Sequence, residues 1–124
     1  MFSDENGDSR LVEMDIPGPE VSYDGDPRSL ALRDIPASTV HITELLEWRP
    51  KLALHPPPRR QLVVILQGVL EISTTAGERR RFEAGDCLLA EDMEGKGHMT
   101  EDVGTDRLVT LSIALLPEWR WPGT

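Results

Sequence analysis

The chain has 124 residues, of which 39% are hydrophobic and 28% are charged, and its formal net charge is −9. This length suits one domain with a single core, and the composition is that of an ordinary globular protein. No apolar run approaches the roughly 20 residues of a membrane helix, and an acidic chain without a basic stripe is a poor candidate for nucleic-acid binding. We therefore expect neither a membrane nor a nucleic acid among its partners.

The leader and the cysteine content suggest a compartment. Residues 1–10 contain no basic region followed by a hydrophobic stretch, so we expect no signal peptide. A single cysteine, Cys87, cannot form an intramolecular disulfide and fits a reducing environment. We expect a cytoplasmic protein in which Cys87 is a small core residue.

Residues 1–38 form an acidic N-terminal segment. Its first 26 residues hold eight acidic side chains against Arg10 alone. Within it, Leu11 to Ile16 alternates polar and apolar residues and predicts a short edge strand, ended by Pro17-Gly18-Pro19. Such a strand has little stability alone, so it needs a sheet to join, either its own or a partner's.

From residue 39 the chain reads as strand after strand, with turn signals every eight to twelve residues. The run Leu62 to Leu66 is rich in β-branched residues and is followed by Gly68, which is typical of a strand buried on both faces. Pro56 to Pro58 cannot lie within a sheet and make a rigid approach to this strand. The expected strands are 39–46, 61–66, 70–74, 79–82, 87–91, 98–102 and 107–115. No helical period extends over 12 residues, so we predict one all-β domain.

The order of a strand, Gly68, a hairpin, Gly85-Asp86, a strand, the bend Gly95-Lys96-Gly97 and His98 resembles the cupin superfamily. The resemblance covers roughly residues 40–115. Within the superfamily, the chain looks most similar to the small single-domain conserved-barrel cupins. It implies a double-stranded β-helix, or jelly roll, with residues 39–116 as the barrel and 117–124 as a C-terminal tail.

The first cupin motif is G(X)5HXH(X)3,4E(X)6G. Counting back from Gly68, Gln61 occupies the glutamate position and His55 the position of the first histidine. Pro57 replaces the second histidine, and Arg49 replaces the opening glycine.

The second motif is G(X)5PXG(X)2H(X)3N. Gly85 opens it, Gly95 and His98 match its centre, and Asp102 stands for the asparagine. Met93 replaces the proline, and two extra residues lie between the glycines.

A complete cupin site offers three histidines and a glutamate to a divalent metal. The resemblance therefore implies that His55, His98 and Gln61 are the metal ligands here, for iron, manganese, zinc or nickel. Two imidazoles and a neutral amide make a weaker site than one with an anionic ligand. The side chains that would complete it are His41, Glu91 or Asp92.

Further candidates for ligand binding are Arg59, Lys96 and Glu91, in addition to Gln61. A partly buried carboxylate such as Glu91 would make a useful general base. Each candidate also has a structural interpretation, because Gln61 can satisfy a buried backbone group and Lys96 can be an exposed turn residue.

Three functions from different classes follow. The first is a metal-dependent enzyme acting on a small organic molecule, with His55 and His98 as ligands. The second is a metal-free module that binds a small apolar or acidic molecule through Gln61, His98 and Arg59 or Arg60. The third is a structural or interaction barrel without catalysis. The fold alone does not decide between these three functions. We expect a small-molecule site in the barrel and favour a bound metal. Whether the protein is an enzyme is left open.

Two expectations concern assembly and geometry. Small cupins are commonly dimers, and Trp119 and Trp121 add apolar area that needs cover. We therefore expect a two-fold homodimer whose interface includes the strand at 11–16 or the C-terminal tail. We also expect His55 and His98 to approach each other inside one mouth of the barrel.

Overall fold

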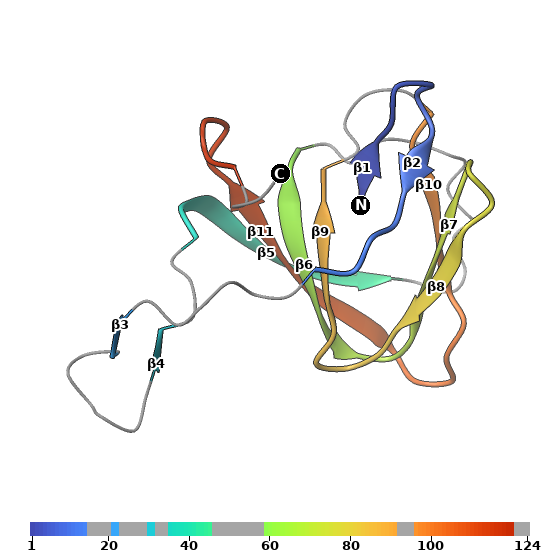
Figure 1. Cartoon of the computed structure of the whole chain (residues 1–124). Helices are drawn as coiled ribbons and strands as arrows, with labels where there is room; N and C mark the ends of the chain where they lie inside the picture. The colour runs from blue at the N-terminus through green and yellow to red at the C-terminus, as the bar shows by residue number, and fades with distance from the viewer. Residues whose placement is uncertain (15–20, 23–29, 32–34, 46–58, 92–95, 121–124) are drawn as a thin grey trace.

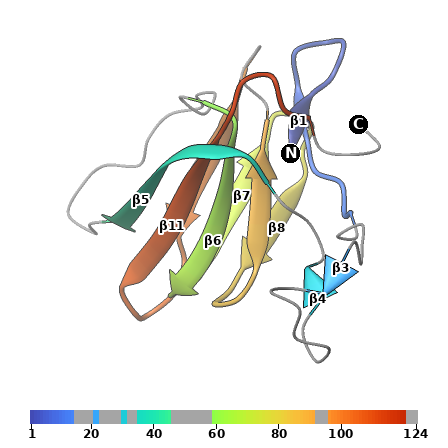
Figure 2. The same ribbon diagram turned by 90° about the vertical axis from the view of Figure 1, so that its left-hand side faces the viewer.

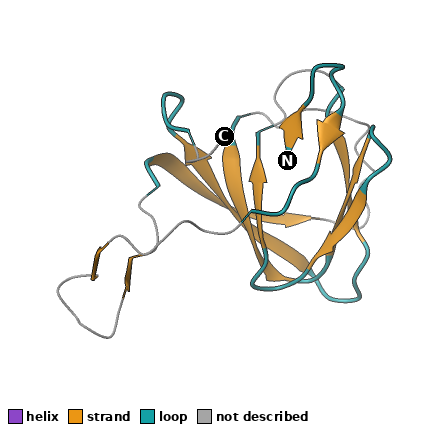
Figure 3. Ribbon diagram, in the orientation of Figure 1, coloured by secondary structure: helices purple, strands orange, loops and turns teal. Residues whose placement is uncertain are grey.

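The computed structural model describes residues 1–14, 21–22, 30–31, 35–45, 59–91 and 96–120. Within these ranges every regular element is a β-strand and every strand pairing is antiparallel, which confirms the predicted all-β class (Figures 1 and 3). The same ranges contain no helix long and apolar enough to cross a membrane.

Two sheets face each other and contain seven of the strands (Figure 1). The first has the order β5 (Ala37–Leu45), β11 (Leu108–Leu115), β6 (Gln61–Gln67) and β9 (Cys87–Ala90), and the second has the order β10 (His98–Asp102), β7 (Leu70–Thr74) and β8 (Arg79–Phe82). Short pairs are formed by β1 (Phe2–Ser3) with β2 (Ser9–Arg10) and by β3 (Val21–Ser22) with β4 (Leu30–Ala31). All seven strands predicted from residue 39 onwards are found, with bounds within two residues of those expected.

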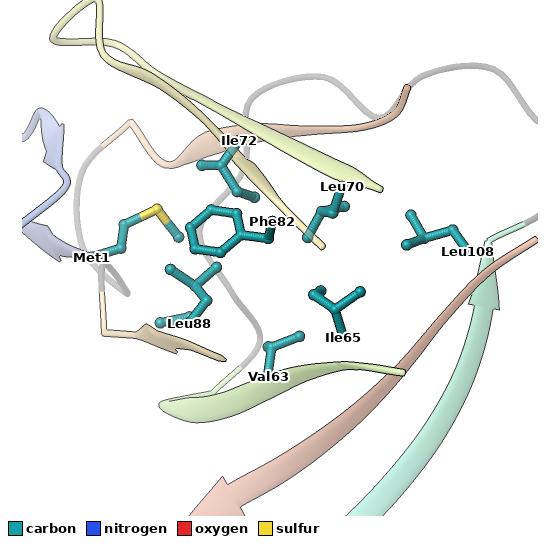
Figure 4. Close-up of a cluster of buried hydrophobic side chains, with 9 residues drawn as sticks. Met1, Val63, Ile65, Leu70, Ile72, Phe82, Leu88 and Leu108 are labelled. Atoms are coloured by element: carbon teal, nitrogen blue, oxygen red, sulfur yellow. The ribbon is translucent and has the colours of Figure 1, made fainter. Parts of the chain in front are cut away.

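The core lies between the two sheets (Figure 4). Val63 and Ile65 of β6 point towards Leu70 and Ile72 of β7, because side chains in a strand alternate between its faces. The remaining members of this buried cluster are Met1, Phe82, Leu88, Ala90 and Leu108.

The outer face of the four-stranded sheet differs from the prediction. Leu62 to Leu66 was expected to be buried on both faces, but Leu66 on the outer side is 48% exposed. Cys87 was expected in the core, and this is wrong: Leu88 and Ala90 take the inner positions of β9, so Cys87 lies opposite Val64 on the outer face and is exposed. In Figure 2 the four strands of this sheet lie in front of β7 and β8.

The N-terminal segment is attached differently from the prediction. Leu11 to Met14 forms no strand, and the paired residues lie earlier, in β1 and β2. The Leu11 amide donates to the carboxylate of Glu78 at 3.1 Å, and Arg80 donates to Glu13 at 3.1 Å. This segment is therefore held by side chains of the β7–β8 hairpin and not by a ladder of backbone hydrogen bonds. Asp15 and Ile16 lie outside the described residues.

Replacing Gly68 by alanine should destabilise the fold. Gly68 has φ +86°, and an added Cβ would lie 2.6 Å from the backbone carbonyl oxygen of Arg107. We expect the free energy of unfolding in urea to fall by about 2–4 kcal/mol. Gly77→Ala is the matched control, because Gly77 also has φ +86° but nothing lies within 4 Å of an added Cβ. Equal losses in the two variants would contradict this reading.

Acidification should weaken the attachment of the β1–β2 hairpin to the start of β10. The Lys96 ammonium donates to Asp8 at 2.8 Å, and this hydrogen bond lowers the pKa of Asp8 below its ordinary 3.8. The pair therefore stabilises the folded state above that ordinary value, and the stabilisation is lost as the pH falls through the lower folded-state pKa. Protection of the Lys96 amide, which donates to the Gly7 carbonyl at 2.9 Å, should decrease below about pH 4.

Hydrogen exchange, corrected for the intrinsic pH dependence, measures this protection. Asp8→Asn should lower protection at neutral pH and remove the acid-dependent step, whereas Asp106→Asn in an exposed turn should retain both. An Asp8→Asn variant with the original pH response would show that the Lys96–Asp8 pair does not hold the hairpin.

Candidate functional site

An open cavity of about 170 Å³ lies between the two sheets. Its apolar lining consists of Val63, Leu70, Ile72, Leu88 and Leu108, and its polar lining consists of Thr43, Gln61, His98, Thr100, Thr110 and Ser112. The two kinds of side chain meet in one space, so the cavity combines an apolar wall with groups that form hydrogen bonds.

Strand register brings the hydroxyl groups into the cavity. Thr110 and Ser112 alternate along β11 and therefore share one face, and Thr43 lies directly opposite Thr110 on β5. From the second sheet, Thr100 faces the same space because it lies opposite the core residue Ile72. Thr43 is exposed and the other three residues are half-buried. Their hydroxyl groups can each donate and accept a hydrogen bond, which suits a polar occupant of the cavity.

His98 lines the cavity from the first position of β10 and is only 6% exposed. It follows the buried Gly97, whose φ of 78° makes the bend that the sequence predicted before this histidine. The β1–β2 hairpin supports this bend, because the buried Ser9 hydroxyl donates to the Gly97 carbonyl at 2.9 Å. The sequence contains no local signal for this support, since Ser9 and Gly97 are 88 residues apart.

Gln61 lines the same cavity from the first position of β6. Its cross-strand neighbours are Ala90 and Ala114, which are small and buried, so no bulky side chain occupies the space beside the amide. The structure thus brings Gln61 and His98, two of the three predicted metal ligands, to one cavity. His55, the third, lies outside the described residues, as do Arg49, Pro57 and Met93.

Arg60 and Glu91 form an ion pair outside the cavity lining. Arg60 Nε donates to Glu91 Oε2 at 2.9 Å, and the two side chains are only 12% and 16% exposed. Arg60 also donates to the carbonyl of Trp119 at 2.6 Å. These contacts attach the C-terminal segment to β6, which is a structural role for both residues.

Lys96 also lies outside the cavity lining. Its exposed ammonium forms the ion pair with Asp8, and this hydrogen bond raises the pKa of Lys96. Its contacts join the β1–β2 hairpin to the start of β10.

Arg59 and His41 form a second polar group, which is not part of the described cavity lining. Arg59 Nη2 donates to His41 Nε2 at 2.8 Å. His41 lies directly opposite the cavity residue Ser112, and Val40 and Ile42 occupy the other face of β5. His41 therefore lies on the inner side of β5, where its side chain is exposed.

The described lining does not by itself make a metal site. No group of three His, Cys, Asp or Glu side chains within the described ranges is close enough to hold a metal ion. The polar lining offers one imidazole, one amide and four hydroxyl groups, a weak donor set for iron, zinc or nickel. The same groups are well suited to hydrogen bonds with an organic molecule.

Comparison with known proteins gives no match, either to a family model or to a curated protein.

Proposed function

We propose that this chain is a small-molecule-binding barrel of the cupin type and that its ligand occupies the cavity between the two sheets. The observation that carries the proposal is the mixed lining of that cavity. Barrels whose role is only structural fill such a space with close-packed apolar side chains. Here His98, Gln61 and four hydroxyl groups occupy inward positions instead.

The size of the cavity indicates the size of the ligand. A cavity of about 150 Å³ is large enough for benzene, and this one measures about 170 Å³. A single ring with one or two polar substituents therefore fits, with the ring against Val63 and Leu88 and the substituents near His98 or Ser112. Water can occupy the polar end when the ligand is absent, because several hydrogen-bonding groups converge there.

The strand connections support the jelly-roll assignment. The chain passes from β6 in one sheet to β7 and β8 in the other, returns to β9, crosses to β10 and ends in β11 of the first sheet. Such repeated crossing between two antiparallel sheets is the pattern of a double-stranded β-helix.

A metal-dependent enzyme is the second candidate. It is favoured by the presence of His98 and Gln61, which align with two cupin ligand positions, in one cavity. His98, Gln61 and His55 would hold the metal, which would supply polarisation of a substrate oxygen. The metal-free site is the first choice because the described lining supplies a single imidazole.

Filling the cavity should abolish binding of a ring-sized probe. Phenol should give saturable shifts of the methyl signals of Val63, Ile72 and Leu88 in NMR spectra of the full chain. Ser112→Phe places a ring in the cavity and should weaken this binding by at least about tenfold. Ser38→Phe, at an exposed position of β5 that does not line the cavity, should leave it unchanged. Absence of saturable shifts in the unmodified chain, or equal binding by Ser112→Phe, would contradict the proposal.

Elemental analysis of untagged protein distinguishes the two candidates. One equivalent of iron, manganese, zinc or nickel that is lost in a folded His98→Ala variant would favour the enzyme. Phenol binding by protein that contains no metal would favour the metal-free module.

A further inference from the structure

We propose that the ligand of the cavity is a small organic acid and that Arg59 binds its carboxylate. This inference rests on the proposed function, because it assigns a chemical class to the occupant of the same cavity. It depends on the position of one guanidinium group, on an unsatisfied hydrogen-bond donor and on the charge of the surroundings.

The Arg59 side chain reaches β5, a strand that contributes Thr43 to the cavity lining. The pairing of β6 with β11 continues beyond Gln61, because the Leu115 amide donates to the Arg60 carbonyl at 3.0 Å. Arg59 comes just before this point in the chain. It contacts His41 of β5, the strand on the far side of β11 from β6. Its guanidinium therefore extends across β11, towards the side of the sheet where Ser112 and Thr43 line the cavity.

One donor of Arg59 is buried and unsatisfied. Arg59 Nε has no hydrogen-bond partner and is inaccessible to solvent. Leaving such a donor unpaired on a charged group is unfavourable, so a missing acceptor is expected there. Nε and a terminal nitrogen of a guanidinium together match the two oxygens of a carboxylate.

The charge of the surroundings points to the same acceptor. Of the eight arginines in the described ranges, six pair with a carboxylate: Arg10, Arg60, Arg79, Arg80, Arg81 and Arg107. Arg59 instead forms a hydrogen bond with the imidazole of His41. A bound organic acid would supply the carboxylate that the other six arginines obtain from the chain.

The ligand class follows from both ends of the site. A ring lies against the apolar wall, its carboxylate is bound by Arg59, and His98 or Gln61 hydrogen-bonds a further substituent. Arg60, the other arginine considered from the sequence, is excluded from this role because Glu91 and Trp119 occupy its donors.

Benzoate and benzyl alcohol test the inference, because they share a ring and differ in charge. The unmodified chain should bind benzoate at least about tenfold more tightly than benzyl alcohol in calorimetric or NMR titrations. Arg59→Gln should remove this preference and leave the affinity for benzyl alcohol unchanged. Arg107→Gln, at an exposed arginine paired with Glu44, should retain the preference.

The outcomes separate this inference from the proposed function. If benzyl alcohol binds and benzoate binds no better, the acid site is wrong while the cavity remains a binding site. If neither probe binds, the proposed function itself is contradicted. If Arg59→Gln weakens both probes equally, Arg59 has a structural role and the inference fails. Should that variant not fold, Arg59→Lys tests the same point, because it keeps the charge and should lose part of the preference by removing the paired donors.

Discussion

The register of β11 against its two neighbours determines most of the features described above. Side chains alternate along a strand, so a slip of one residue would exchange the two faces of β11. Thr110 and Ser112 would then face outwards, and Leu111 and Ile113 would fill the cavity. The same register places His41 opposite Ser112 and puts Leu111 and Ile113 on the outer face. Hydrogen bonds along two ladders therefore fix the cavity, its polar edge and the outer surface together.

The fold was predictable where the signals are local. Strands from residue 61 onwards follow from alternation and from glycines such as Gly68, whose close contact with the backbone of Arg107 excludes a side chain. The exposure of Cys87 was not predictable, because a short run of apolar residues does not show which of them face inwards. Leu11 to Met14 was assigned to a strand for its alternation, but its partners are side chains of a hairpin more than 60 residues away.

The candidate site was predictable in part. Alignment with the cupin motifs selected His98 and Gln61, and both line the cavity. Thr110 and Ser112 were missed, although two hydroxyl residues at alternate positions of an otherwise apolar strand are a usable signal. The sequence could not show which of Arg59 and Arg60 is available to a ligand. Both are arginines, and they differ only in the side of the chain from which their side chains project. Glu91 decides that question by pairing with Arg60, and only the tertiary structure brings these two residues together.

The support of His98 by the β1–β2 hairpin has a consequence for the order of folding. Ser9 bonds Gly97, and Asp8 pairs with Lys96, across 88 residues of chain in each case. Contacts of such sequence separation form late, because closing a long loop costs entropy before any contact compensates for it. During synthesis the hairpin emerges before β10, yet it cannot dock until β10 has been made. The end of the cavity that contains His98 is thus completed among the last parts of the molecule.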